Sequence, residues 1–302
     1  MSQHPPTARQ GETNQVDRRQ ILLASLGTAG ALTAAGRSEA SSGTTAYQAS
    51  RKEGLRQSVC RWCYGRMPLE ELASAAKAME LESVEILDPA DFAVLQEHDL
   101  ICAMVNSHSI EKGLNKRENH EGCIAAIRGG IDAAAAAGYP NVITFSGNRD
   151  GQSDEEGLEL CTEALQSVVG YAEQKNVTIC MELLNSKVDH RDYMADSSEW
   201  LVELVQRVGS ERFKILYDIY HAQVMEGDVI ATIRKHYESI GHYHTAGVPG
   251  RNEIDDSQEL YYPAIMKAIR ATGYKGLVGQ EFIPKGPDPI ASLRDAVRIC
   301  DV

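Results

Sequence analysis

Four polar residues lie at the ends of four successive apolar runs in the second half of the chain: Glu182, Asp218, His244 and Glu281. Each run is typical of a buried strand, and loop residues and then a helical pattern follow each one. Three carboxylates and one imidazole are ligands that a hard or borderline divalent cation prefers. The set predicts a metal site for Mg²⁺ or Mn²⁺, and it also suits Co²⁺ or Zn²⁺. One such carboxylate alone would indicate only a helix N-cap or a surface charge, so the prediction depends on all four together.

The elements that must position these residues alternate regularly between strand and helix patterns from about residue 56. Eight strand–helix pairs match a closed (β/α)8 TIM barrel, an α/β fold, in number and length. An open doubly wound sheet is the alternative, but no glycine-rich phosphate turn follows the first strand. We expect a single-domain barrel over residues 51–302, with strands at 57–64, 83–88, 100–108, 141–148, 177–185, 213–220, 239–247 and 275–282.

The active site of such a barrel lies at the carboxyl ends of its strands. The four candidate ligands come from the fifth to the eighth expected strands, one from each, which are neighbours around half of the barrel. Side chains from adjacent strand ends can converge on one ion. His242 has the same strand parity as His244, so either could be the ligand, and the position of His244 nearer the strand end favours it.

The charge of the chain limits the class of its partners. The chain has 302 residues and a formal net charge of −13. Sequence-independent binding to nucleic acid depends on Lys and Arg facing phosphates, so we expect no nucleic-acid partner. A DNA-repair endonuclease would need a basic groove and more histidines than the single HxH offers.

Seven cysteines are spread through apolar runs and are best interpreted as buried thiols. Cys60 and Cys63 form a CxxC, which could be a redox or metal pair. Both fall in the first expected strand, where alternation would point their side chains to opposite faces. The pattern therefore favours two structural thiols.

The first 50 residues look separate from the barrel. Arg18 and Arg19 precede a Gly/Ala-rich apolar stretch and then a tract of small residues, which resembles a twin-arginine export signal followed by a disordered linker. The apolar stretch is short for a membrane span, which needs about 20 residues. The signal implies the twin-arginine translocase as a partner, cleavage near Ala34 or Ala40, and a periplasmic or exported protein. A disordered tail with a chance arginine pair, and hence a cytoplasmic protein, is the alternative.

The order of these motifs resembles the xylose isomerase-like TIM barrel superfamily of sugar isomerases and epimerases. The segment HYHTAGVPGRNEIDD, at 242–256, is similar to the VPGRHE-type segment of the hydroxypyruvate isomerase family. ELLNSK, at 182–187, resembles the EPLNxR segment of that family, with a departure at Leu183 and Leu184. Some hydroxypyruvate isomerases carry Gln where this chain has His244, whereas ketose epimerases carry His.

The resemblance implies roles for individual residues. Glu182, Asp218, His244 and Glu281 take the places of the metal ligands, and Glu182 and Glu281 also match the two glutamates that move protons on either side of the substrate. His221 and Arg251 match positions that hold substrate oxygens. Two further residues near strand ends, His108 and Lys187, could also contact the substrate.

These roles predict an aldose–ketose isomerase that converts hydroxypyruvate to tartronate semialdehyde through an enediolate. Such chemistry needs a base, a return acid and stabilisation of a developing oxyanion. Two glutamates can shuttle the proton, a divalent cation can supply Lewis acidity, and Arg251 can hold a carboxylate in bidentate fashion. The alternatives are a ketose 3-epimerase or sugar isomerase with the same ligands, or an exported sugar-binding barrel without catalysis. A homo-oligomer is compatible with the sequence.

Overall fold

The computed structural model describes residues 54–302, and the export-signal prediction lies outside the described residues. In this part of the chain seven strands form one parallel sheet in the order β2-β1-β7-β6-β5-β4-β3. The strands are β1 (Arg56–Cys60), β2 (Ser83–Glu85), β3 (Asn141–Thr144), β4 (Thr178–Glu182), β5 (Phe213–Asp218), β6 (Ile240–Thr245) and β7 (Leu277–Gln280).

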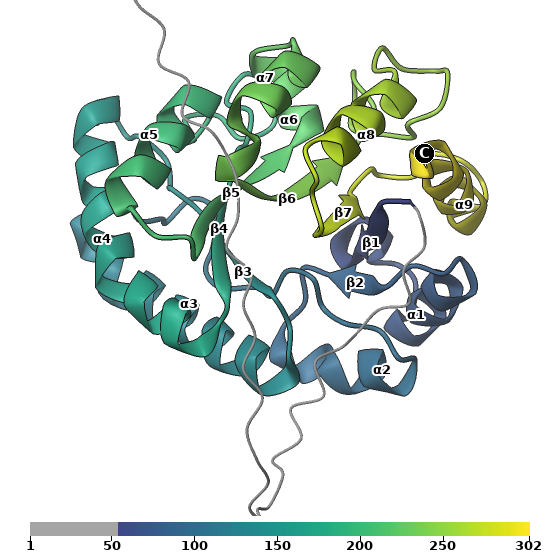
Figure 1. The fold of residues 1–302 in the computed structure, drawn as a ribbon, viewed down its shortest axis with the longest axis horizontal. Helices are drawn as coiled ribbons and strands as arrows, with labels where there is room; N and C mark the ends of the chain where they lie inside the picture. Colours follow the sequence, from purple (N-terminus) through teal and green to yellow (C-terminus); the bar gives the residue numbers. More distant parts are fainter. Residues whose placement is uncertain (1–53) are drawn as a thin grey trace, which may run out of the picture. The chain divides into compact units, whose positions relative to one another are not determined.

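The third expected strand appears as isolated bridges instead of a continuous strand. Ile101 bridges to Ser83 beside β2, and Val105 bridges to Val142 in β3, so the segment spans the gap between the two outer strands. The sheet curls into a barrel that this segment closes, as Figure 1 shows. The predicted eight-unit TIM barrel is therefore confirmed, with one strand reduced to irregular pairing.

Helices surround the strands as an outer ring (Figure 1). They are α1 (Leu69–Ala78), α2 (Phe92–Glu97), α3 (His120–Ala137), α4 (Asp154–Lys175), α5 (Ser198–Val208), α6 (Ile219–Met225), α7 (Val229–His236), α8 (Tyr262–Ala271) and α9 (Pro289–Cys300). Local sequence explains their ends. Ser153 caps α4 by accepting from Glu156 N–H, and Gly138 ends α3 in the left-handed conformation, with φ 74°. No helix within residues 54–302 is long and apolar enough to cross a membrane.

The first strand is shorter than the sequence pattern predicts. It ends at Cys60, and residues 61–64 form a 3-10 helix, so Cys63 is not in a strand. Within the described residues all seven cysteines are free, and every one except Cys63 is buried. The expectation of buried thiols holds for those six, whereas the strand argument for Cys63 is wrong because the chain turns at Arg61.

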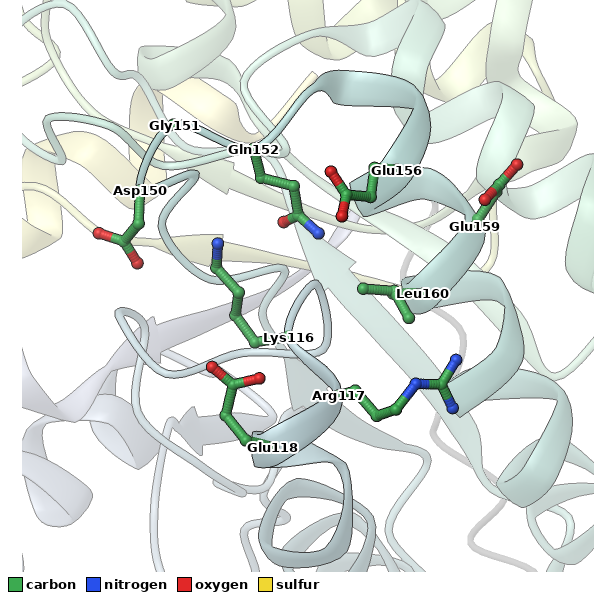
Figure 2. A pocket seen from close by; sticks show the side chains of 9 residues that line it. All are labelled: Lys116, Arg117, Glu118, Asp150, Gly151, Gln152, Glu156, Glu159 and Leu160. Atoms are coloured by element: carbon green, nitrogen blue, oxygen red, sulfur yellow. The ribbon is translucent and has the colours of Figure 1, made fainter.

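An open polar hollow lies on the surface beside the start of α4 (Figure 2). Its two cations are already engaged: Lys116 Nζ donates to the carbonyl of Arg149, and Arg117 pairs with Glu163. None of the candidate site residues lines it. The chemistry predicted from the sequence must therefore be sought at the carboxyl ends of β4 to β7.

Candidate metal centre and active site

The four predicted ligands come together at the carboxyl ends of four adjacent strands. Glu182 ends β4, Asp218 ends β5, His244 is the penultimate residue of β6, and Glu281 directly follows β7. The register pairs Asp218 with His244. All four residues are buried, and one ligand atom from each lies within 4.8 Å of the others. Parallel pairing thus delivers the four side chains to one point.

Three of the donor atoms in this cluster lack hydrogen-bond partners among the described residues. His244 Nδ1 lies 3.1 Å from Glu281 Oε2 and 3.4 Å from Glu182 Oε1. Glu182 Oε1, Asp218 Oδ2 and His244 Nδ1 are buried and have no hydrogen-bond partner among residues 54–302. Leaving a buried polar atom unsatisfied costs about 1–3 kcal/mol. Three carboxylates and one imidazole that converge, with two of the oxygens and the nitrogen lacking hydrogen-bond partners in the described residues, fit a divalent cation.

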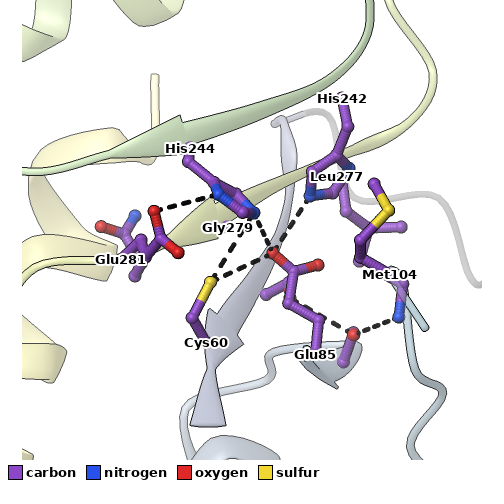
Figure 3. Close-up of polar contacts among 12 residues, drawn as sticks. Cys60, Glu85, Met104, His242, His244, Leu277, Gly279 and Glu281 are labelled. Carbon is purple, nitrogen blue, oxygen red and sulfur yellow. Dashed lines mark hydrogen bonds and ion pairs between the residues drawn. The ribbon is translucent and has the colours of Figure 1, made fainter. Parts of the chain in front are cut away.

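His244 faces this cluster and His242 does not. Nε2 of His244 lies 2.9 Å from Glu85 Oε1, on the side of the ring away from the other ligands, and His242 Nε2 lies 3.0 Å from the same oxygen (Figure 3). The structure thus distinguishes the two histidines that the sequence left open.

Burial and the neighbouring charges shift the pKa values of the four candidate ligands in different directions. Burial and then the charge of Glu281 raise the pKa of Glu182 and raise the pKa of Asp218 well above its usual range. Burial also acts to raise the pKa of Glu281, but His244 and Arg251 outweigh it and hold that pKa well below normal. Burial acts to lower the pKa of His244, but Cys60 and Glu281 outweigh it and raise that pKa well above normal. A bound cation would be ligated directly by these side chains and would offset their crowded negative charge.

Arg251 reaches into the cluster from the loop after β6. Its Nη2 lies 2.7 Å from Glu281 Oε2 and 3.6 Å from Asp218 Oδ2. The guanidinium lies over the rings of Trp62, at 4.9 Å, and Tyr220, at 5.5 Å, which hold its plane. Its Nε is buried without a hydrogen-bond partner among the described residues. Arg251 therefore keeps an unused donor beside the candidate ligands.

His221 presents a second donor. Asp218 caps α6 by accepting from His221 N–H, which fixes the histidine beside the cluster. Asn185 N–H donates to His221 Nδ1 at 3.0 Å, so the proton of the neutral ring belongs on Nε2. Burial, helped by Arg251, lowers the pKa of His221 well below its usual value. Nε2 lies 3.8 Å from Asp218 Oδ2, where a neutral N–H could hold a substrate oxygen.

The two remaining candidates lie elsewhere. His108 Nε2 is 2.8 Å from Thr144 Oγ1 at the end of β3, and no contact joins it to the four ligands in the described chain. Lys187 Nζ donates to the carbonyls of Val224 and Met225 at the end of α6. Lys187 is thus engaged with the helix end and not with the cluster.

Two side chains that contact the ligands carried little or no weight in the sequence argument. Trp62 Nε1 donates to Glu281 Oε1 at 2.8 Å. Glu85, which contacts both histidines, is fully buried at the end of β2. The available signal was a carboxylate inside the apolar run SVEIL, where a buried charge needs a partner.

Comparison with known proteins shows which family the chain resembles. The family model described as "Xylose isomerase-like TIM barrel" matches residues 74–300. The hydroxypyruvate isomerase of Escherichia coli (strain K12) is 26% identical over 233 residues, covering 71% of this chain and 88% of that protein. The 2-oxo-tetronate isomerase of Cupriavidus necator is 27% identical over 225 residues, covering 70% of this chain and 86% of the relative.

A similar solved structure carries a different description. The crystal structure of an AP endonuclease, family 2, from Brucella melitensis superposes with a TM-score of 0.69 at 25% identity, over 79% of this chain and 97% of the other. The same barrel thus appears under more than one described activity, so the substrate must be argued from the site.

Proposed function

The chain belongs to the xylose isomerase-like TIM barrel family and is an isomerase of that family, and we propose that it interconverts hydroxypyruvate and tartronate semialdehyde with a divalent metal ion. The observation that carries this proposal is the convergence of Glu182 and Glu281, from strands β4 and β7, on one buried four-ligand cluster beside Arg251. Two carboxylates flank the place where a small substrate would sit, and a cationic fork lies next to them.

The residues Glu182, Asp218, His244 and Glu281 would hold the ion, and Mg²⁺ or Mn²⁺ suits three oxygens and one nitrogen. Once bound, the ion supplies Lewis acidity that favours the enediolate. Every other step falls to the side chains of the chain itself.

The proton transfer is proposed as follows. One glutamate takes a proton from C3 of hydroxypyruvate, which leaves the enediolate. The other glutamate returns a proton to C2, while the hydroxyl proton moves from the oxygen on C3 to the oxygen on C2, which gives tartronate semialdehyde. His221 Nε2–H would hold a substrate oxygen, and the free Nε–H of Arg251 would bind the carboxylate.

A substrate test decides this proposal. Purified protein loaded with Mg²⁺ or Mn²⁺ should convert hydroxypyruvate and exchange its C3 protons with deuterated water, as followed by NMR, and chelation should abolish both. Turnover of ketohexoses without turnover of hydroxypyruvate would indicate a ketose 3-epimerase instead. His244 favours that alternative, because ketose epimerases carry His at this ligand position. Comparison with 2-oxo-tetronate would define the length of acid that the site accepts.

Export through the twin-arginine translocase is a separate proposal that depends on Arg18 and Arg19. A double Lys substitution, Arg18→Lys with Arg19→Lys, keeps the charge and should retain the protein inside the cell. Equal periplasmic amounts of the two forms after fractionation would refute it.

A further inference from the structure

Glu85 is a buried carboxylate that the proposed chemistry does not use. Its Oε1 accepts from three side chains: His244 Nε2 at 2.9 Å, His242 Nε2 at 3.0 Å and the thiol of Cys60 at 3.4 Å. Glu85, Cys60 and both histidines are 0% exposed. Figure 3 shows the carboxylate between the two imidazoles. A charge so placed costs several kcal/mol in desolvation unless its partners compensate.

The fold makes room for this carboxylate across the barrel interior. Glu85 lies on β2, whereas His244 lies on β6, and β1 and β7 separate these strands in the sheet. Gly279 of β7 pairs directly with His244. A Cβ at position 279 would overlap Glu85 Oε1 and press on the His244 ring, 2.8 Å from Cδ2. The glycine in this strand therefore leaves the space that Glu85 occupies.

The contact determines which atom His244 offers to an ion. A carboxylate that accepts from Nε2–H fixes the proton on Nε2 and leaves the lone pair on Nδ1. Nδ1 is the atom that faces Glu182 and Glu281 and lacks a hydrogen-bond partner in residues 54–302. His242 Nε2 contacts the same carboxylate oxygen. The contacts to the two imidazoles therefore hold Glu85 in place against His244.

We propose that Glu85 is a positioning residue for the metal centre, which orients His244 and selects its Nδ1 as the ligand atom. The inference rests on the metal dependence in the proposed function. The competing interpretation is a second, softer metal site made by Cys60, Glu85 and His244 Nε2, which also lie within 4.8 Å of one another. It is disfavoured because His244 Nε2, once protonated towards Glu85 Oε1, has no lone pair left for an ion, although Glu85 Oε2 is itself buried without a hydrogen-bond partner among residues 54–302.

The first experiment measures metal affinity in Glu85→Gln. Gln keeps the volume and removes the charge. The Kd for Mn²⁺, from competition with a fluorescent chelator, should rise about 10–100-fold. Glu173→Gln is the matched control: Glu173 is an exposed carboxylate on α4 that accepts from Ser210 Oγ, and its Kd should equal that of the wild type. An unchanged Kd in Glu85→Gln overturns the positioning role.

The second experiment uses the wild-type chain and so does not depend on the folding of a variant. With ¹⁵N-labelled histidine and diamagnetic Zn²⁺, NMR should show His244 protonated at Nε2 and metal-shifted at Nδ1. A metal shift at Nε2, or two ions bound per wild-type chain, overturns the proposal in favour of the second site. A wild-type chain that binds neither Mn²⁺ nor Zn²⁺ overturns the proposed function itself, whereas binding with an unaffected Glu85→Gln overturns only the positioning role.

Discussion

The β7 side and the β4 side of the cluster hold the same residue type in opposite environments. On the β7 side, Glu281 receives Trp62 Nε1–H on Oε1 and Arg251 Nη2 on Oε2, at 2.8 and 2.7 Å. On the β4 side, Glu182 Oε1 has no hydrogen-bond partner within the described part of the chain. The pKa of Glu281 is held low and that of Glu182 is raised.

We propose that this difference gives the proton transfer a direction. A pair of titratable groups whose environments push their pKa values apart is suited to divide acid and base roles. Glu281, kept ionised by its donors, is the better base towards C3 of hydroxypyruvate. Glu182, which retains a proton more readily, is the better acid towards C2. The two glutamates are therefore alike in residue type and differ in electrostatic environment.

Replacing each glutamate by Gln tests the assignment and should give the largest effect. Loss of a positioned acid or base lowers kcat by about 10²–10⁴-fold, so both variants should be nearly inactive. They should differ in deuterated water: Glu281→Gln should lose exchange at C3, whereas Glu182→Gln should retain it. Saturating Mn²⁺, checked by titration of each variant, removes weaker metal binding as the cause. Exchange that survives only in Glu281→Gln would reverse the two roles.

The strand-end ligands were predictable because the barrel imposes a simple rule. Residues at the ends of consecutive strands meet at one face, so Glu182, Asp218 and Glu281 could be grouped before any coordinates were known. The barrel itself followed from the regular alternation of strand and helix patterns, with one strand less regular than its apolar run 100–108 suggested.

The supporting contacts could not be predicted in the same way. Glu85 meets His244 across two intervening strands, and that register follows from the packing of the interior and from the space at Gly279. Trp62 depends on the turn at Arg61, where a short 3-10 helix replaces the expected end of β1. Lys187 shows that proximity in sequence does not ensure proximity in the site. It lies five residues after Glu182, but its ammonium donates to the carbonyl of Met225 and not to the cluster.

Arg251→Lys removes the planar fork from the β7 side and should give the next largest effect. A hydrogen bond to a charged group is worth about 1.5–3 kcal/mol, so KM for hydroxypyruvate should rise about 10–100-fold. Lys187→Met is the matched control, because its ammonium binds the carbonyls at the end of α6, and KM should be unchanged. An unchanged KM in Arg251→Lys would show that Arg251 acts only through its positive charge, which Lys retains.

Asp218→Asn tests whether the negative charge of Glu281 raises the pKa of Asp218 in the metal-free protein. Burial, and then Glu281, raise the pKa of Asp218 above its unfolded value, so the folded state binds more protons than the unfolded state once the pH exceeds about 3.9. This contribution to stability is present at low pH and is lost as the pH rises towards the folded pKa. Asn does not titrate, so the variant lacks this fall in the free energy of unfolding, which is at most about 1.4 kcal/mol per pH unit. The Asn side chain can still cap α6.

Urea unfolding of the metal-free proteins at several pH values measures the effect. The stability of Asp218→Asn relative to the wild type should increase from pH 5 to pH 7. A relative stability that stays constant over this range would mean that Asp218 is already ionised at pH 5, and the charge of Glu281 would then not raise its pKa.

Trp62→Phe makes the smallest change on the β7 side, since it removes one N–H donor and keeps an aromatic ring near Arg251. A net hydrogen bond is worth about 0.5–1.5 kcal/mol, so kcat/KM near neutral pH should fall by about tenfold or less. Loss of a donor disfavours the ionised carboxylate, so the pKa of Glu281 rises and the acid limb of the pH profile moves to higher pH. Trp200→Phe is the matched control, because Trp200 Nε1 donates to the carbonyl of Asp154 away from the site, and its profile should match the wild type. An acid limb that stays in place in Trp62→Phe would mean that Arg251 and His244 alone keep Glu281 ionised, and the asymmetry between the two glutamates would then originate within the ligand cluster and its arginine.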